Sequence, residues 1–207
     1  MGGLPYTEMR GTAGVLIHDI KDGAKRIERI VAELKNYARP QHSGVSVAIS
    51  VNAVVERAVR LLSHLISQKT RRFKTDFSAA LPLINADPQQ LEQVVVNLLI
   101  NALEALSDPE NAVSVATRLL DNGDSVCVEV RDEGIGIVAE HIEQLCDPFF
   151  TTKQANGGTG LGLAIVASLV RAHGGRLKFI SSVGQDTCAQ AIFPATAIQA
   201  DETDYAQ

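Results

Sequence analysis

The stretch Asn97-Leu98-Leu99-Ile100-Asn101-Ala102-Leu103-Glu104-Ala105-Leu106 lies in a long apolar run that begins near Leu91. Asn97 and Asn101 are four positions apart, so on a helix they lie one turn apart on the same face. An amide beside a buried stripe must be hydrogen-bonded or bound to a ligand, because an unpaired buried amide is costly. The two asparagines are therefore either satisfied core residues or ligands, and an amide oxygen suits Mg²⁺ beside a phosphate. The apolar stripe expected beside them consists of Val94, Leu98, Leu99, Ala102, Ala105 and Leu106.

Two glycine-rich stretches lie downstream of this helix. Asp132-Glu133-Gly134-Ile135-Gly136 follows a strand-like run, and Gly157-Gly158-Thr159-Gly160-Leu161-Gly162-Leu163 opens an amphipathic run. Glycines let a backbone approach a flat ligand closely, and free N–H groups at a helix N-terminus attract phosphate. The second stretch lacks the Gly-Lys-Ser/Thr of a Walker loop, and no strand-helix-strand unit surrounds it as in a dinucleotide fold. It therefore predicts a phosphate contact of a different kind.

Asp147-Pro148-Phe149-Phe150-Thr151-Thr152-Lys153 lies between these two stretches. In order and spacing, the four segments resemble the N, G1, F and G2 boxes of sensor histidine kinases, and the resemblance covers roughly residues 15–194. Those kinases share an ATP-binding fold with DNA gyrase, the Hsp90 chaperones and MutL. The resemblance implies an α+β fold, a two-layer α/β sandwich of the Bergerat type preceded by a long helix, with ATP and Mg²⁺ as cofactors.

The resemblance also implies roles for individual residues. Asp132 would accept a hydrogen bond from the adenine amino group, although an aspartate before glycine is also a common turn residue. Asn101, the second asparagine of the N box, would bind Mg²⁺. The residues expected to contact the nucleotide are Asn97, Asn101, Asp132, Gly134, Gly136, Lys153, Gly158, Gly160, Leu161, Gly162 and Thr187.

Residues 147–160 resemble a lid over the nucleotide. Lys153 either touches the triphosphate or is solvated. Phe149 and Phe150 either pack under the lid or join the core, and at least one of them is expected in the core. Near Thr187 the chain departs from the family pattern, because Asp186 stands where the family usually has glycine.

Asn97 occupies the position at which gyrase and MutL carry a glutamate that activates water. An amide cannot act as a general base at neutral pH, so we expect a site that binds ATP and hydrolyses it poorly. Glu104 lies near these asparagines on the same helix but is turned one step around the helix axis. A role on the surface is at least as open to it as a role at the site.

A heptad pattern over residues 15–39 predicts a helix that packs in a helical bundle. It resembles the second helix of the kinase dimerisation domain, so a homodimer through this helix is one expected arrangement. The pair His18-Asp19 imitates the family's phosphoacceptor motif, but Asp22 and Gly23 replace the Asn/Thr and Pro that should follow. His18 is thus a candidate acceptor only, no catalytic residue is certain, and we expect this chain to lack its acceptor histidine. The heptad positions are Ile17, Ile20, Ala24, Ile27, Val31, Leu34 and Ala38.

The chain divides into a lead-in (1–14), a partial dimerisation helix (15–40), an ATP-binding catalytic domain (41–195) and a tail (196–207). In the catalytic domain, Asn52 and Asp87 are the expected N-caps of two helices, with Pro88 at the first helical position of the second. The expected strands are 45–49, 73–77, 83–86, 112–120, 125–131, 175–181 and 187–193, and the expected helices are 53–67, 87–106, 138–145 and 161–172. They predict one mixed, largely antiparallel sheet with helices on one face.

Composition limits the function classes. A net charge of −5 and an aromatic content of 4% give no basis for nucleic-acid binding through bulk charge or base stacking. Cys127, Cys146 and Cys188 lack paired metal-type spacing and indicate reduced thiols, with Cys127 and Cys188 as packing residues. No apolar run approaches the roughly 18 residues of a membrane span. We therefore expect a cytoplasmic chain, or the cytoplasmic part of a larger or membrane-bound sensor.

These features predict the ATP-binding catalytic part of a sensor histidine kinase in a two-component phosphorelay. The full-length protein would transfer the γ-phosphoryl group of ATP to the histidine of a phosphoacceptor domain, and then to an aspartate on a response regulator receiver domain. One alternative is an ATP-gated conformational module of the chaperone or MutL kind, against which Asn97 argues. The other is a non-enzymatic interaction module built on the heptad helix, which ATP binding would exclude.

Overall fold

The computed structural model describes residues 45–120, 123–153 and 158–196, together with the isolated helical positions 20, 21, 23, 24 and 31. The lead-in, most of the heptad segment with His18, and the tail from residue 197 lie outside the described residues. Ile20 and Val31, two of the heptad positions, are helical and exposed.

From residue 45 onward, the described residues form strands that alternate with helices. The strands are β1 (Val47–Ile49), β2 (Arg72–Phe77), β3 (Ile84–Ala86), β4 (Ala112–Leu119), β5 (Ser125–Asp132), β6 (Arg176–Ser181) and β7 (Thr187–Pro194). The helices are α2 (Val51–Leu61), α3 (Ser63–Lys69), α4 (Pro88–Ala105), α5 (Ala139–Ile142) and α6 (Gly162–Ala172). Most of these elements match the expected ranges within one or two residues.

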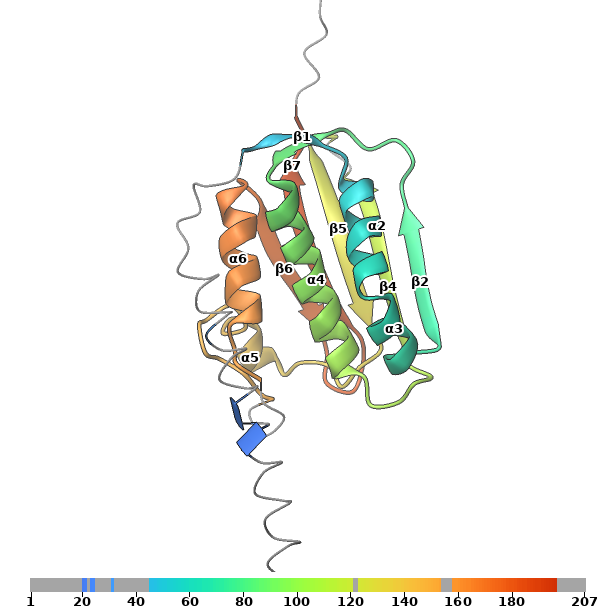
Figure 1. The fold of residues 1–207 in the computed structure, drawn as a ribbon, viewed down its shortest axis with the longest axis vertical. Coiled ribbons are helices and arrows are strands. Elements are labelled where there is room, and N and C mark those ends of the chain that lie inside the picture. The colour runs from blue at the N-terminus through green and yellow to red at the C-terminus, as the bar shows by residue number, and fades with distance from the viewer. Residues whose placement is uncertain are drawn as a thin grey trace, which may run out of the picture.

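Within the described residues, five strands form one sheet in the order β2-β4-β5-β7-β6, and β1 pairs with β3 separately. The β2–β4 pair is parallel, whereas β4–β5, β5–β7 and β6–β7 are antiparallel. The helices α2, α4 and α6 lie side by side over one face of this sheet (Figure 1). This arrangement confirms the expected two-layer sandwich with a mixed, largely antiparallel sheet.

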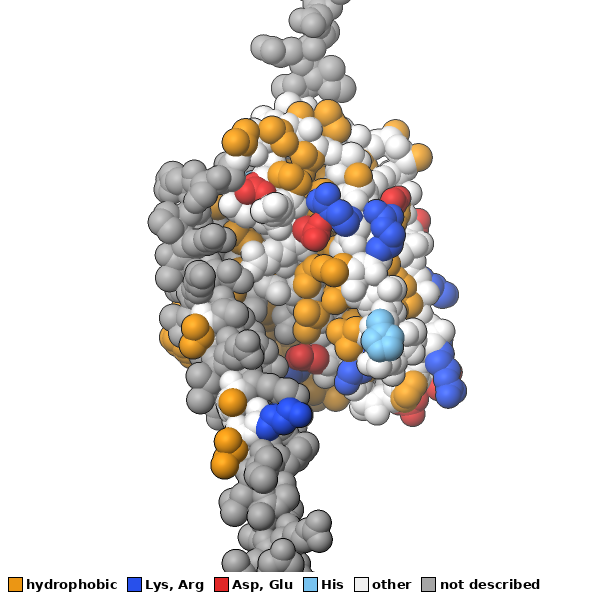
Figure 2. All heavy atoms as spheres, in the orientation of Figure 1, with side chains coloured by type: hydrophobic (Ala, Val, Ile, Leu, Met, Phe, Trp, Pro, Cys, Tyr) orange, Lys and Arg blue, Asp and Glu red, His pale blue; other side chains and the backbone are white. Residues whose placement is uncertain are grey.

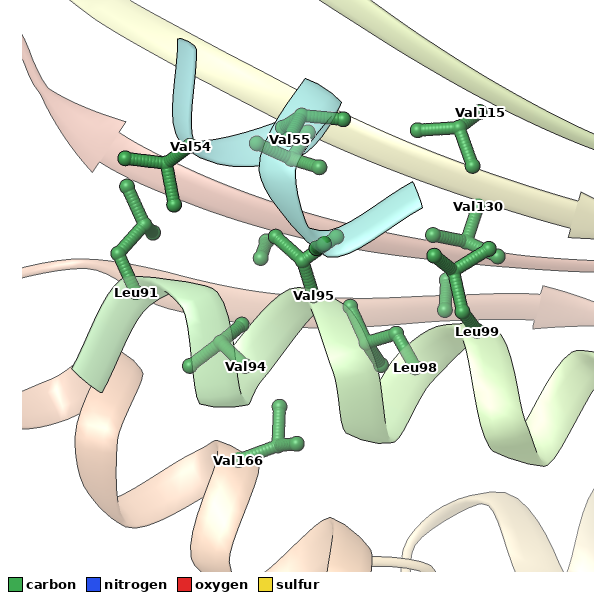
Figure 3. Close-up of a cluster of buried hydrophobic side chains, with 14 of the residues drawn as sticks. Val54, Val55, Leu91, Val94, Val95, Leu98, Leu99, Val115, Val130 and Val166 are labelled. Carbon is green, nitrogen blue, oxygen red and sulfur yellow. The ribbon is translucent and has the colours of Figure 1, made fainter. Parts of the chain in front are cut away.

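Helix α4 lies at the centre of the helical layer and carries much of the core. Its buried side chains meet those of α2, α6 and the sheet, as Figure 3 shows for Val55, Val166 and Val130. Two residues of the expected stripe, Ala105 and Leu106, are only partly buried. Because α2 and α6 both pack against α4, the buried face of α4 is wider than the expected stripe. Its fully buried members are Leu91, Val94, Val95, Leu98, Leu99, Ala102 and Leu103.

The start of α4 follows the expected capping pattern. Asp87 is the N-cap, with its Oδ1 accepting hydrogen bonds from the Gln89 N–H at 2.8 Å and the Gln90 N–H at 3.3 Å, and Pro88 follows it. The first expected helix differs, because Ser50 rather than Asn52 caps α2. That helix also breaks at Leu62, which separates α2 from α3.

Asn52 is displaced from the capping role by two tertiary contacts. Its amide nitrogen donates to the Ser78 carbonyl at 2.8 Å, and its amide oxygen accepts from the Thr117 hydroxyl at 2.6 Å. The side chain therefore joins the first turn of α2 to the sheet, a role that local sequence does not reveal.

The expected helix 138–145 is much shorter in the structure. Only Ala139–Ile142 is helical, and the chain continues through i→i+3 bonds from the Gln144 N–H to the His141 carbonyl and from the Asp147 N–H to the Gln144 carbonyl. Such bonds tighten the chain into turns and do not propagate an α-helix.

His173 joins the C-terminal end of α6 to the start of α4. Its Nε2 accepts a hydrogen bond from the Asp87 backbone N–H at 3.1 Å, while its Nδ1 lies 2.7 Å from the Leu169 carbonyl oxygen. These partners require the neutral tautomer with the proton on Nδ1. His173 therefore caps both helices rather than serving chemistry.

His173→Ala is expected to lower the free energy of unfolding by about 1–3 kcal/mol, because it leaves the Asp87 N–H unpaired beside the core. Urea denaturation measures this loss. His64→Ala is the matched control, since His64 is exposed on α3 and bonds only within its own helix. Equal losses in the two variants would contradict the capping role.

Candidate functional site

A cavity of about 780 Å³ lies between α4, the loop after β5, residues 150–153 and the start of α6. Nine of the eleven residues that the sequence predicts at a nucleotide, all of them described, line this cavity. The other two do not. Leu161 is buried in the hydrophobic core next to α6, and Gly134 is buried behind Asp132.

The floor of the cavity is formed by a cross-strand pair. Asp132 at the end of β5 faces Thr187 at the start of β7, and the two residues are 4% and 8% exposed. The Asp132 Oδ1 accepts a hydrogen bond from the Gly134 N–H at 2.9 Å. Burial raises the pKa of Asp132 to about 6, although the Gly134 hydrogen bond and the Lys153 charge oppose that rise. The floor thus presents a carboxyl group with its second oxygen available to a ligand.

Two glycines make the wall beside Asp132 possible. A Cβ on Gly134 would lie 2.6 Å from both the Ala105 carbonyl oxygen and the Asp132 Oδ1. Gly136 has a φ of +68°, and a Cβ there would lie 2.0 Å from the Ser182 carbonyl oxygen. Gly136 lines the cavity, whereas Gly134 acts on it indirectly by orienting Asp132.

The two asparagines of α4 have different environments. The Asn97 amide nitrogen donates to the Gly162 carbonyl at 3.3 Å, which ties α4 to the first residue of α6. The Asn101 side chain also lines the cavity, and it has no hydrogen-bond partner among residues 45–120, 123–153 and 158–196. Asn97 is therefore partly structural, and Asn101 is the amide that is free to meet a ligand.

Lys153 lies against the C-terminal end of α4. Its Nζ is 3.4 Å from the Asn101 carbonyl oxygen and 3.3 Å from the Glu104 Oε2. The residue is thus engaged at the cavity instead of being solvated. Glu104 itself lines the cavity, which the sequence analysis did not assign to it. The missed signal is its spacing of seven residues from Asn97, two helical turns on one face.

The two phenylalanines of segment 147–160 stay out of the core, so the expectation that at least one joins it is wrong. Phe149 is 61% exposed and has a φ of 69°. Gly160 lies so close to it that a Cβ on Gly160 would be 2.4 Å from the carbonyl carbon of Phe149. Phe150 lines the cavity and packs edge-on against His141, with 5.3 Å between the ring centroids.

Asp186 fits its position without the glycine that the family usually has there. Its φ is not positive, and its carboxylate forms an ion pair with Arg131 on the neighbouring strand β5. The turn leading to Thr187 is therefore compatible with an aspartate.

Beyond the cavity, the described surface offers few other sites. In Figure 2, acidic and basic side chains lie close together over α2 and α4, and the ion pair between Arg57 and Glu92 joins these two helices. No described cluster of three or more His, Cys, Asp or Glu side chains could hold a metal ion. No helix among the described residues has the length and apolar character needed to cross a bilayer.

The cysteines agree with the expected packing roles. Cys127 and Cys188 are buried and free, and burial raises their pKa values to about 11 and about 12. Such thiols remain protonated and unreactive at neutral pH.

Comparison with known proteins gives the same picture. A family profile described as "Histidine kinase-, DNA gyrase B-, and HSP90-like ATPase" matches residues 86–197. Sensor histidine kinase ZraS from Escherichia coli K12 is 31% identical over 200 residues, which cover 95% of this chain and 42% of ZraS. The chain thus spans less than half the length of this relative.

Solved structures share the fold. The structure of full-length ShkA in complex with AMPPNP has a TM-score of 0.74 at 24% identity, covering 95% of this chain and 41% of ShkA. The catalytic domain of histidine kinase ThkA has a TM-score of 0.63 at 26% identity, covering 72% of this chain and 97% of that domain.

Proposed function

The chain belongs to the family of histidine kinase-, DNA gyrase B- and HSP90-like ATPases, and from this membership we propose that it is the ATP-binding catalytic part of a sensor histidine kinase. The observation that carries the proposal is the cavity, with Asp132 and Thr187 at its floor and the start of α6 at its other side. A carboxylate at the floor suits an amino group of a base, and the N–H groups of a helix start suit phosphates.

Asn101 is the proposed Mg²⁺ ligand. Its side chain lines the cavity without a hydrogen-bond partner among the described residues, and an amide oxygen is a ligand that Mg²⁺ accepts. Mg²⁺ usually takes one or two protein ligands, with phosphate oxygens and waters filling the remaining positions, so a single amide fits. The ion would neutralise charge on the phosphates during transfer.

The arrangement of carboxylates favours phosphoryl transfer over ATP hydrolysis. Among the described residues that line the cavity, Asp132 and Glu104 are the carboxylates. Asp132 lies at the floor, and Glu104 is paired with Lys153. Asn97, at the position of the water-activating glutamate, is an amide tied to Gly162. Neither of these two described carboxylates stands free at the position of the water-activating group, which favours retention of the γ-phosphoryl group for another acceptor.

We propose that this acceptor is a histidine on a helical phosphoacceptor domain, followed by an aspartate on a response regulator receiver domain. The heptad helix over residues 15–39 would join the catalytic part to that domain, with a homodimer as the arrangement. These partners rest on family membership, and no nucleic-acid partner is proposed.

The test incubates the purified chain with Mg²⁺ and γ-labelled ATP, and follows bound nucleotide, acid-labile protein phosphate and released inorganic phosphate together. We expect nucleotide binding with little released phosphate, and label on a separate helical-hairpin substrate when one is added. Label on the chain itself that is lost in His18→Gln would identify His18 as the acceptor. Absence of nucleotide binding would overturn the proposal, and rapid phosphate release would favour an ATPase module.

A further inference from the structure

The hydroxyl of Thr187 meets a second hydroxyl beneath the cavity floor. Ser181, the last residue of β6, is the register partner of Thr187 on β7. Their side-chain oxygens lie 2.8 Å apart, the ordinary distance of an O–H···O hydrogen bond. One of the two hydroxyls donates to the other. Which of them donates determines whether Thr187 presents a hydrogen-bond donor or an acceptor to the cavity.

The other contacts of Ser181 determine where its proton goes. Its Oγ accepts a hydrogen bond from the Ile137 N–H at 2.9 Å, which leaves its own O–H as the remaining donor. Two acceptors are in reach, the Thr187 Oγ1 at 2.8 Å and the Asp186 carbonyl oxygen at 3.3 Å. The second distance exceeds the usual range for O–H···O bonds. Either hydroxyl can donate across the 2.8 Å pair, and the shorter of the two contacts favours Ser181 as the donor to Thr187.

Thr187 then has a proton that Ser181 does not take. Within the described residues, Ser181 is the hydrogen-bond partner of the Thr187 side chain, and Thr187 lines the cavity. Its O–H is consequently directed to a ligand. Beside it, across the β5–β7 pair, the Asp132 carboxylate is an acceptor. The floor thus places an acceptor next to a donor.

This order of polar groups distinguishes the two purines. Adenine presents an amino donor beside a ring-nitrogen acceptor on its Watson–Crick edge, whereas guanine presents a carbonyl acceptor beside a ring N–H donor. With guanine, the carbonyl acceptor would face the Asp132 acceptor and the ring N–H donor would face the Thr187 donor, so neither hydrogen bond would form. We propose that Ser181 is a positioning residue that fixes the Thr187 hydroxyl as a donor and so selects adenine over guanine nucleotides. This inference rests on the proposed function.

The test compares dissociation constants for Mg·ATP and Mg·GTP by calorimetry in the wild type and Ser181→Ala. In the variant, the Thr187 hydroxyl can rotate to accept as well as donate. We expect the preference for ATP over GTP to fall by roughly tenfold, the effect of one hydrogen-bond polarity. Ser181→Thr, which retains the hydroxyl, should keep the wild-type preference. Ser182→Ala is the matched control, because this exposed neighbour takes no part in the side-chain network.

Thr187→Val gives an independent reading should Ser181→Ala fold poorly, since it removes the hydroxyl that Ser181 orients. It should lower the ATP preference as much as Ser181→Ala does, and the double variant should lower it no further. An unchanged ATP-to-GTP ratio in Ser181→Ala, or equal losses for both nucleotides, would overturn the inference while leaving the proposed function intact. A wild type that binds neither nucleotide would overturn both.

Discussion

Asp132→Asn is expected to weaken ATP binding by about 100-fold or more, because it removes the charged acceptor at the floor of the cavity. The asparagine retains the size of the side chain and can still accept from the Gly134 N–H. The matched control is Glu133→Gln at the next residue. The exposed Glu133 carboxylate forms an ion pair with Arg72 at 3.0 Å and does not line the cavity. Calorimetric titration with Mg·ATP measures both. A dissociation constant within a few-fold of wild type would contradict the adenine role of Asp132.

The same carboxyl group predicts a pH dependence. Burial raises the pKa of Asp132 to about 6 in the folded protein, and an amino donor would favour the ionised form and lower it on binding. ATP affinity should therefore be constant above about pH 7 and decline as the pH falls below about 6. Asp132→Asn should show no such decline. A wild-type affinity that does not change between pH 5 and pH 8 would contradict this assignment.

The free energy of unfolding should change with pH in the opposite direction to the ATP affinity. A raised pKa means that the folded state disfavours the ionised carboxylate, so Asp132 lowers stability as the pH rises from its ordinary pKa of 3.8 through about 6. Asp132→Asn removes that cost, and we expect it to raise the free energy of unfolding by about 1–3 kcal/mol at pH 8. A variant that loses ATP binding while gaining stability would exclude misfolding as the cause.

The features that the sequence predicts well depend on neighbouring residues along the chain. Asp87-Pro88 begins α4 because capping and the fixed φ of proline act within one turn. Gly136 has a positive φ in a turn that begins right after a strand end, so its position too follows from local chemistry. Local signals of this kind locate the helices, the strand ends and most of the cavity wall.

The features that escape prediction depend on partners from distant segments. Asn52 has the residue type of an N-cap but bonds to Ser78 and Thr117 instead. Ser181 lies at an ordinary strand position, and only the β6–β7 register brings its hydroxyl to Thr187. The ion pair between Glu104 and Lys153 likewise joins residues that are far apart in the sequence. In each case the pairing of elements, and not the residue type, determines the role.

Asn97 and Asn101 also differ in their partners, although they are the same residue type, and this difference predicts that they affect the Mg²⁺ dependence of ATP binding differently. Asn97 and Asn101 lie one turn apart on α4, and both line the cavity. Asn97 donates to the Gly162 carbonyl, whereas the Asn101 side chain has no partner among the described residues. A substitution at either position removes an amide of the same kind from the same helix face, so each controls for the other.

Asn101→Ala is expected to abolish most of the gain in ATP affinity that Mg²⁺ provides, reducing that gain at least about tenfold, because the amide oxygen is the proposed protein ligand of the ion. Asn97→Ala should retain the Mg²⁺ dependence and instead lower stability by about 1 kcal/mol through loss of its tie to α6. Dissociation constants for ATP measured with Mg²⁺ and with EDTA, beside urea denaturation of both variants, separate the two roles. Mg²⁺ dependence that survives in Asn101→Ala and disappears in Asn97→Ala would move the metal one turn up the helix, and with it the position at which the γ-phosphoryl group is held.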